Sequence, residues 1–170
     1  DWSSAFNTLQ DALDSATGND QIWIAQGTYR PTDTNGMNDP REASFRIHSA
    51  LQVYGGFEGN ETSLSQRRPA TFRVYLTGDL LGDDLTGGDT SDNAYHVTQV
   101  DGATATEPLL DGLFIGRGNA NSSTTSLHKY GAGLIVWNYS FNISYVVSIS
   151  ILILSFFFIF SLFWGFGVLG

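Results

Sequence analysis

Short runs of alternating apolar and polar residues recur along this chain, and each is soon followed by a glycine. The clearest are Ile22–Ile24, Leu51–Val53 and Val74–Leu76. Alternation over about four to six residues indicates a β-strand with one face buried, because successive side chains point to opposite faces. A single short run cannot shelter its own apolar face, so the chain can fold only if several runs pack side by side.

Polar loops of unequal length separate these runs, and further runs follow at 45–47, 95–100, 109–115 and 133–137. A repeat of short strands with loops of variable length is typical of a solenoid, in which each coil keeps its stacked strands while its loops vary. An antiparallel sandwich is the alternative, but it needs pairs such as Asn-Gly as tight links between strands. No such pair stands as a two-residue link; the candidates are Asn35-Gly36, Asp101-Gly102 and Asp111-Gly112.

Residues 1–16 predict an amphipathic helix. Its apolar residues recur at helical spacing, at Phe6, Leu9 and Leu13. Ser3 or Ser4 is the expected N-cap, and Gly18 is the expected C-cap. A stack of parallel strands leaves an open strand edge, and we expect the apolar stripe of this helix to cover it.

A series of short motifs lies in a fixed order between Trp2 and Asn138. They are Trp2-Ser3-Ser4-Ala5-Phe6, Leu9-Gln10-Asp11-Ala12-Leu13, Ile22-Trp23-Ile24-Ala25, Gly27-Thr28-Tyr29, Val53-Tyr54-Gly55-Gly56-Phe57, Glu61-Thr62-Ser63-Leu64, Gly78-Asp79, Asn93-Ala94-Tyr95-His96-Val97, Leu110-Asp111-Gly112 and Gly118-Asn119-Ala120-Asn121. In this order they resemble the N-terminal part of pectate-lyase-like right-handed parallel β-helix proteins, which occur on the surfaces and in the secretions of bacteria.

The resemblance implies an all-β fold: a right-handed parallel β-helix, or solenoid, with an N-terminal capping α-helix and coils of three short parallel strands. Some relatives in this family bind or cleave acidic polysaccharides. No catalytic motif of such enzymes matches this sequence. We therefore assign no catalytic, cofactor-binding or metal-binding residue from the resemblance, and a non-catalytic role is favoured over an enzymatic one.

The net charge of the chain limits the classes of molecule that it can bind. It has 8 lysines and arginines against 17 aspartates and glutamates, which gives a net charge of -9. This charge repels the phosphates of nucleic acids, so we expect no nucleic-acid partner. The absence of cysteine excludes disulfides and thiolate zinc sites. The resemblance favours an extracellular or cell-surface location.

The end of the chain has a different composition. Every charged residue lies at or before Lys129, and residues 145–169 are uncharged and largely apolar. About 20 apolar residues span a bilayer, so this tail is a candidate transmembrane helix and the only expected membrane contact. We expect a boundary between a domain at 1–138 and a tail at 139–170. A frameshift or read-through into unrelated sequence, or a buried hydrophobic element, would also explain the tail.

Two groups of residues could bind ions. The loop after Gly78 contains closely spaced aspartates at Asp79, Asp83, Asp84, Asp89 and Asp92. Ca²⁺ prefers such oxygen ligands, so Ca²⁺ is a possible cofactor, but the spacing matches no EF-hand and a solvated acidic loop is favoured. The histidines show no metal-binding spacing and are expected to be structural: His48, His96 and His128.

Two further groups could act on a saccharide. The basic concentration Arg67, Arg68 and Arg73 could serve proton abstraction by analogy with lyases. Pairing with Glu58 or Glu61 is the favoured alternative. Five aromatic residues could form an outward platform for sugar rings, or could pack beneath loops: Trp23, Tyr29, Tyr54, Phe57 and Tyr75.

Three function hypotheses remain. The first is a secreted or cell-surface module that is non-catalytic and binds carbohydrate or serves as a structural element. The second is a truncated polysaccharide lyase or hydrolase whose active coils are missing. The third is a membrane-anchored surface protein, which requires the tail at 145–169 to be a true membrane segment.

Overall fold

The computed structural model describes residues 1–48, 50–101, 108–123, 127–129, 132–137, 142–146 and 151–154. The strands are β1 (Gln21–Ala25), β2 (Gly27–Tyr29), β3 (Phe45–His48), β4 (Gln52–Phe57), β5 (Val74–Thr77), β6 (Thr98–Asp101), β7 (Leu109–Gly116), β8 (Leu134–Trp137), β9 (Asn142–Val146) and β10 (Ile151–Leu154). The helices are the α-helix α1 (Leu9–Ser15) and the 3₁₀ helices η1 (Trp2–Ser4), η2 (Pro40–Glu42), η3 (Leu64–Gln66), η4 (Asp84–Thr86), η5 (Thr90–Asp92) and η6 (Leu127–Lys129).

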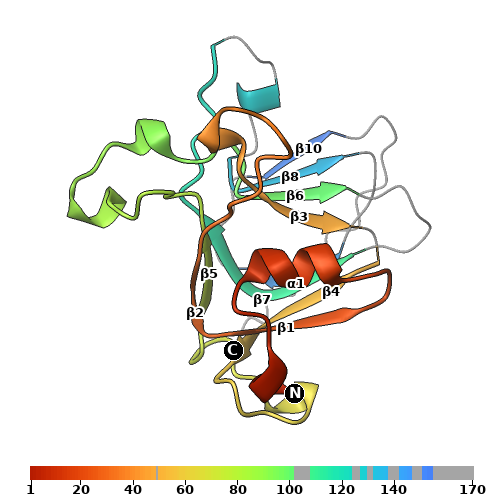
Figure 1. Ribbon diagram of the computed structural model, residues 1–170. Coiled ribbons are helices and arrows are strands. Elements are labelled where there is room, and N and C mark those ends of the chain that lie inside the picture. Colours follow the sequence, from red (N-terminus) through yellow and green to blue (C-terminus); the bar gives the residue numbers. More distant parts are fainter. Residues whose placement is uncertain are drawn as a thin grey trace, which may run out of the picture.

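The strands form two sheets (Figure 1). The larger is six-stranded, with the order β1-β4-β7-β5-β2 and with β9 also paired to β7. The smaller is four-stranded, with the order β10-β8-β6-β3. Every strand pair in the described residues is parallel, which excludes the antiparallel sandwich.

Strand β7 joins two parts of the larger sheet. Its first residues, Leu109–Asp111, pair with β4, and its last residues, Leu113–Gly116, pair with β5. Gly112 lies between them in the left-handed region, with φ of +77°. A Cβ on Gly55 would lie 2.3 Å from the carbonyl oxygen of Gly112, so the two glycines allow β4 and β7 to approach at this bend.

The prediction of an all-β right-handed parallel β-helix is wrong. The solenoid requires separate stacks of short strands. Here β7 pairs with both β4 and β5, besides β9, and so joins their strands into one sheet that bends sharply and is nearly barrel-like, with an α-helix packed on it (Figure 1). The apolar pattern of residues 109–115 shows that they are extended. It does not show how many strands pair with β7, and the bend at Gly112 lets β4 and β5 pair with successive parts of it.

The core lies between the sheets and follows the alternation of the strands. On β1, Ile22 and Ile24 are buried while Gln21 and Trp23 are exposed or half-buried. Corresponding apolar residues from the other strands fill the same interior, namely Phe45, Ile47, Val53, Val74, Leu76, Val100, Leu110, Leu113, Ile115 and Leu134. The strand runs predicted from the sequence are confirmed at β1, β3, β4, β5, β7 and β8.

The N-terminal helix is shorter than predicted. Asp1 caps η1, which takes up Ser3 and Ser4, and the N-cap of α1 is Thr8, whose hydroxyl accepts from the backbone N–H of Asp11 at 3.1 Å. The C-cap is Ala16, so both predicted caps are wrong. Leu9 and Leu13 are buried, and α1 packs on β1 and β3, an edge strand of each sheet (Figure 1).

Two strands lie within the predicted tail. β9 pairs with β7 and β10 pairs with β8, so the expected helical conformation is wrong for residues 142–146 and 151–154. Residues 155–170 lie outside the described part of the chain. Within the part that is described, no helix has the length and apolar character needed to cross a bilayer. The domain boundary at 138 and the membrane anchor stay predictions.

Candidate functional site

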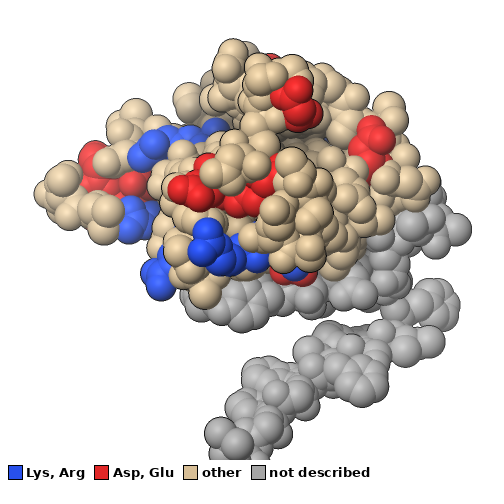
Figure 2. Space-filling view, turned by 90° about the horizontal axis from the view of Figure 1, so that it is seen from below, with Lys and Arg blue, Asp and Glu red and all other residues tan. Residues whose placement is uncertain are grey.

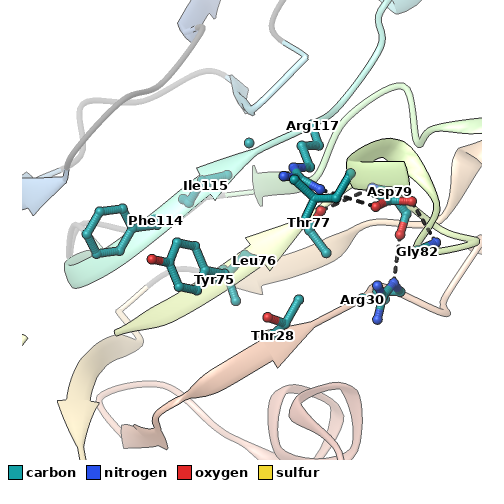
Figure 3. A pocket seen from close by; sticks show the side chains of 12 residues that line it. Thr28, Arg30, Tyr75, Leu76, Thr77, Asp79, Gly82, Phe114, Ile115 and Arg117 are labelled. Carbon is teal, nitrogen blue, oxygen red and sulfur yellow. Dashed lines mark hydrogen bonds and ion pairs between the residues drawn. The ribbon is translucent and has the colours of Figure 1, made fainter. Parts of the chain in front are cut away.

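A groove of about 540 Å³ runs along β2, β5 and β7 (Figure 3). Its floor is a row of outward-facing residues in register on the three strands: Thr28 is paired with Tyr75, and Tyr75 with Phe114. We call Thr28, Tyr75 and Phe114 the aromatic row. The row faces outward because Val74 and Leu76, on either side of Tyr75, point into the core and are fully buried.

The two rings of the aromatic row contact each other. The Tyr75 and Phe114 centroids are 5.0 Å apart with a tilt of 35°. Tyr75 is 39% exposed, one of few large apolar side chains that the described surface leaves open, and Phe114 is half-buried. Arg73 adjoins both rings: its guanidinium lies 5.7 Å from the Phe114 centroid, and Nη1 donates to the Tyr75 hydroxyl at 3.5 Å.

Charged residues close the other end of the groove (Figure 3). Asp79 is 2% exposed, and its Oδ1 accepts from the backbone N–H of Gly82 at 2.6 Å and of Asp83 at 3.0 Å. Its other oxygen pairs with Arg117 at 3.4 Å, while Arg30 donates to the Asp79 carbonyl at 2.7 Å. Arg117 has a left-handed backbone, with φ of +59°, which is uncommon for a residue with a side chain and marks a constrained position.

The acidic loop brings together only part of the predicted group. Asp79, Asp83 and Asp84 converge, each offering an oxygen within 4.8 Å of the others. Asp92 is close enough to act on Asp83. Burial, and the repulsion of Asp92, Asp79 and Asp84, raise the pKa of the Asp83 carboxyl. Asp89 is separate: it caps η5 by accepting from the Ser91 hydroxyl and N–H, and these bonds lower its pKa.

Two histidines that are distant in sequence meet in the structure. His96 is 3% exposed, and its ring lies edge-on to His128 with centroids 5.5 Å apart. His128 stacks on Tyr95 at 4.2 Å, and its Nε2 lies 3.2 Å from Glu42. His48 is exposed at the end of β3. The burial of His96 fits the predicted structural role, and sequence spacing gave no signal of its contact with His128.

The predicted basic group is divided. Arg67 pairs with Asp111 and lies 5.1 Å from the Tyr54 centroid, whereas Arg68 lies over Phe72. The expected pairing with glutamate is therefore wrong for Arg67. Glu61 instead accepts three backbone N–H groups of its own loop, from Glu58, Gly59 and Asn60. Burial acts to raise the pKa of this carboxyl, but the backbone bonds outweigh it and lower the pKa.

The predicted aromatic platform is largely buried. Phe57 and Tyr54 are inside, Trp23 stacks on Phe57 at 4.8 Å, and the hydroxyl of half-buried Tyr29 donates to the Ala25 carbonyl at 2.8 Å. Of the five predicted rings, Tyr75 alone is exposed. Its partner Phe114 was missed because it lies within the continuous apolar run Leu113–Ile115, where the sequence does not distinguish the outward residue.

Comparisons with protein-family models, curated proteins and solved structures found no match to this chain. The resemblance to pectate-lyase-like proteins thus stays a prediction, and the function has to be argued from the groove itself.

Proposed function

We propose that this chain is a non-catalytic secreted or cell-surface module that binds an acidic polysaccharide in the groove over the aromatic row. The observation that carries the proposal is the exposed contact between Tyr75 and Phe114, with Arg73 beside it and Arg117 at the opposite end of the groove. The expected location follows from this role, because such polymers are found outside cells.

The aromatic row supplies the apolar part of such a site. One face of a sugar ring is a patch of C–H groups, and an exposed aromatic ring removes that patch from water. Thr28, Tyr75 and Phe114 lie on neighbouring strands, which are spaced about 4.8 Å apart. The row is therefore extended and open along the sheet, which suits a segment of polymer better than a single small molecule.

The arginines supply the charge that selects an acidic polymer. A guanidinium presents a planar fork of donors that matches a carboxylate. Arg73 and Arg117 are both exposed: Arg73 lies beside Tyr75 and Phe114, and Arg117 lies at the end of the groove that Asp79 closes. A uronate chain laid along the groove would have carboxylates within reach of both, although the net charge of the whole chain is negative.

The carboxylate that lines the groove is already bound by other groups of the protein. This carboxylate, Asp79, is held by two backbone N–H groups and Arg117. Among the described residues that line the groove there is no histidine and no second carboxylate to act with it. This arrangement favours binding over turnover.

Titration of polygalacturonate into the full chain tests the proposal, with dextran as a neutral polymer. Tyr75→Ala and Phe114→Ala should each weaken binding about 3- to 10-fold, the equivalent of about 0.5–1.5 kcal/mol for one aromatic contact. Phe6→Ala is the matched control, because Phe6 is 58% exposed but lies outside this groove. Equal binding of both polymers would remove the role of the arginines. Release of unsaturated uronates would show that the module is an enzyme.

A further inference from the structure

The loop between β5 and β6 projects from the sheets as a lobe (Figure 1). We call residues 79–93 the acidic loop. It contains η4 and η5, and Figure 2 shows acidic side chains gathered on the projecting lobe with basic side chains beside them. The acidic loop begins at the buried Asp79 and ends at the buried Asn93.

Three carboxylates of the acidic loop converge on one point. One oxygen from each of Asp79, Asp83 and Asp84 lies within 4.8 Å of the other two. Ca²⁺ binds oxygen ligands at about 2.3–2.6 Å, so two ligands on opposite sides of one ion stand roughly 5 Å apart. All three carboxylates are therefore within reach of a single ion as they stand.

Asn93 gives an independent indication of a ligand. Its amide group borders the cluster, because Nδ2 donates to Asp84 Oδ2 at 3.0 Å, and a half-turn of the amide would place Oδ1 there instead. The residue is 2% exposed, and its Oδ1 is buried with no hydrogen-bond partner among the described residues. A buried amide oxygen without a donor is costly, and amide oxygens are ligands that Ca²⁺ takes together with carboxylates.

Several carboxylates of the acidic loop also lack hydrogen-bond or ion-pair partners among the described residues. Oδ1 of Asp83, Asp84 and Asp92 is buried without a hydrogen-bond partner in the described part of the chain. Arg117 offsets Asp79, but no ion pair within the same part reaches the other three. The converging oxygens of Asp79, Asp83 and Asp84 therefore hold like charges close together, and these charges repel one another. A divalent cation would relieve both the repulsion and the missing partners.

We propose that the acidic loop binds one Ca²⁺ through the carboxylates of Asp79, Asp83 and Asp84 and the amide oxygen of Asn93. Gly88 makes room for this arrangement, since a Cβ at that position would lie 2.2 Å from the Asp83 carboxyl carbon. The ligands come from an irregular loop, which suits the flexible coordination of Ca²⁺ better than the strict octahedron of Mg²⁺.

The ion would also shape the groove. Gly82 belongs to the acidic loop and lines the groove beside Asp79, and Leu85 of η4 lines it as well. Fixing the loop therefore fixes one wall of the groove. The Ca²⁺ site does not rest on the proposed function, because it is argued from other residues and would exist without any saccharide.

Calorimetric titration of CaCl₂ into the chelator-treated full chain, together with thermal unfolding, tests this inference. We expect CaCl₂ to raise Tm with a dissociation constant of about 10⁻⁴–10⁻³ M, and MgCl₂ to raise it less. Asp84→Asn keeps an oxygen but removes a charge, so it should weaken Ca²⁺ binding about tenfold or more. Asp89→Asn makes the same change in the same loop, keeps a good cap for η5 and should bind like the wild type.

The unfolding temperature in chelator adds a second readout. Asp84→Asn removes repulsion, so it should unfold at or above the wild-type temperature before CaCl₂ and gain little from it. A wild-type chain that gives neither heat nor a Tm shift, or an Asp89→Asn chain that loses binding equally, would overturn the site. Intact Ca²⁺ binding without polygalacturonate binding would overturn only the proposed function.

Discussion

Alanine at position 112 should destabilise the protein by about 2–5 kcal/mol. Gly112 has φ of +77°, where a residue with a side chain costs about 1–2 kcal/mol. A Cβ there would also lie 2.8 Å from the carbonyl oxygen of Gly55 and 3.1 Å from Cγ of Pro69. Overpacking of this kind costs about 1–3 kcal/mol, and neither contact is with the end of a flexible side chain.

Gly116 offers a matched control at the end of the same strand. A Cβ on Gly116 would meet nothing within 4 Å, and its φ is not in the left-handed region. Gly116→Ala should therefore be neutral or stabilise by about 0.4–1 kcal/mol, because alanine restricts the unfolded chain. The contrast between the two variants isolates the bend of β7 from the general effect of adding a methyl group.

Urea unfolding followed by tryptophan fluorescence measures the difference. With a dependence of about 2 kcal/mol per molar urea, Gly112→Ala should lower the midpoint by roughly 1–2.5 M, while Gly116→Ala should leave it in place or raise it. Coincident midpoints for the two variants would show that β7 does not bend at Gly112 in solution, and the two-sided pairing of this strand would have to be abandoned.

Two more substitutions test the helix cap and the glutamate loop. Thr8→Ala should cost about 1 kcal/mol in urea unfolding by removing the cap of α1, whereas Ser4→Ala removes only an exposed hydroxyl and should cost little. The lowered pKa of Glu61 means that its stabilising effect is full above its ordinary value of 4.5 and is lost as pH falls through the lower folded value. Glu61→Gln should flatten this acid limb of Tm against pH, and an unchanged limb would contradict the prediction.

The strands were predictable where burial alternates. The sequence indicates the inward faces of β1 and β5, because a single aromatic residue separates the buried Ile22 from Ile24 and the buried Val74 from Leu76. The pairing of the strands was not predictable in the same way. Alternation determines which side of a strand is buried, but it does not show how many strands pair with it, and β7 pairs with β4, β5 and β9.

The candidate sites show the same division between local and distant information. The clustering of Asp79, Asp83 and Asp84 follows from their closeness in sequence, and the role of Asp89 as a separate cap depends on a turn that spacing does not reveal. The contact of Tyr75 with Phe114 joins residues that only strand register brings together. Register depends on the whole sheet, so no short motif could have shown it.

The parallel pairing of all described strands has a consequence for how the chain reaches this structure. Parallel partners cannot form a local hairpin. β1 gains its ladder only when β4 has arrived, after β2, a long loop and β3. The conformational entropy of the loops is lost before strand contacts form and offset that loss, so folding should be slow. During that interval the apolar strands are open to other chains, and dilute conditions should favour refolding over aggregation.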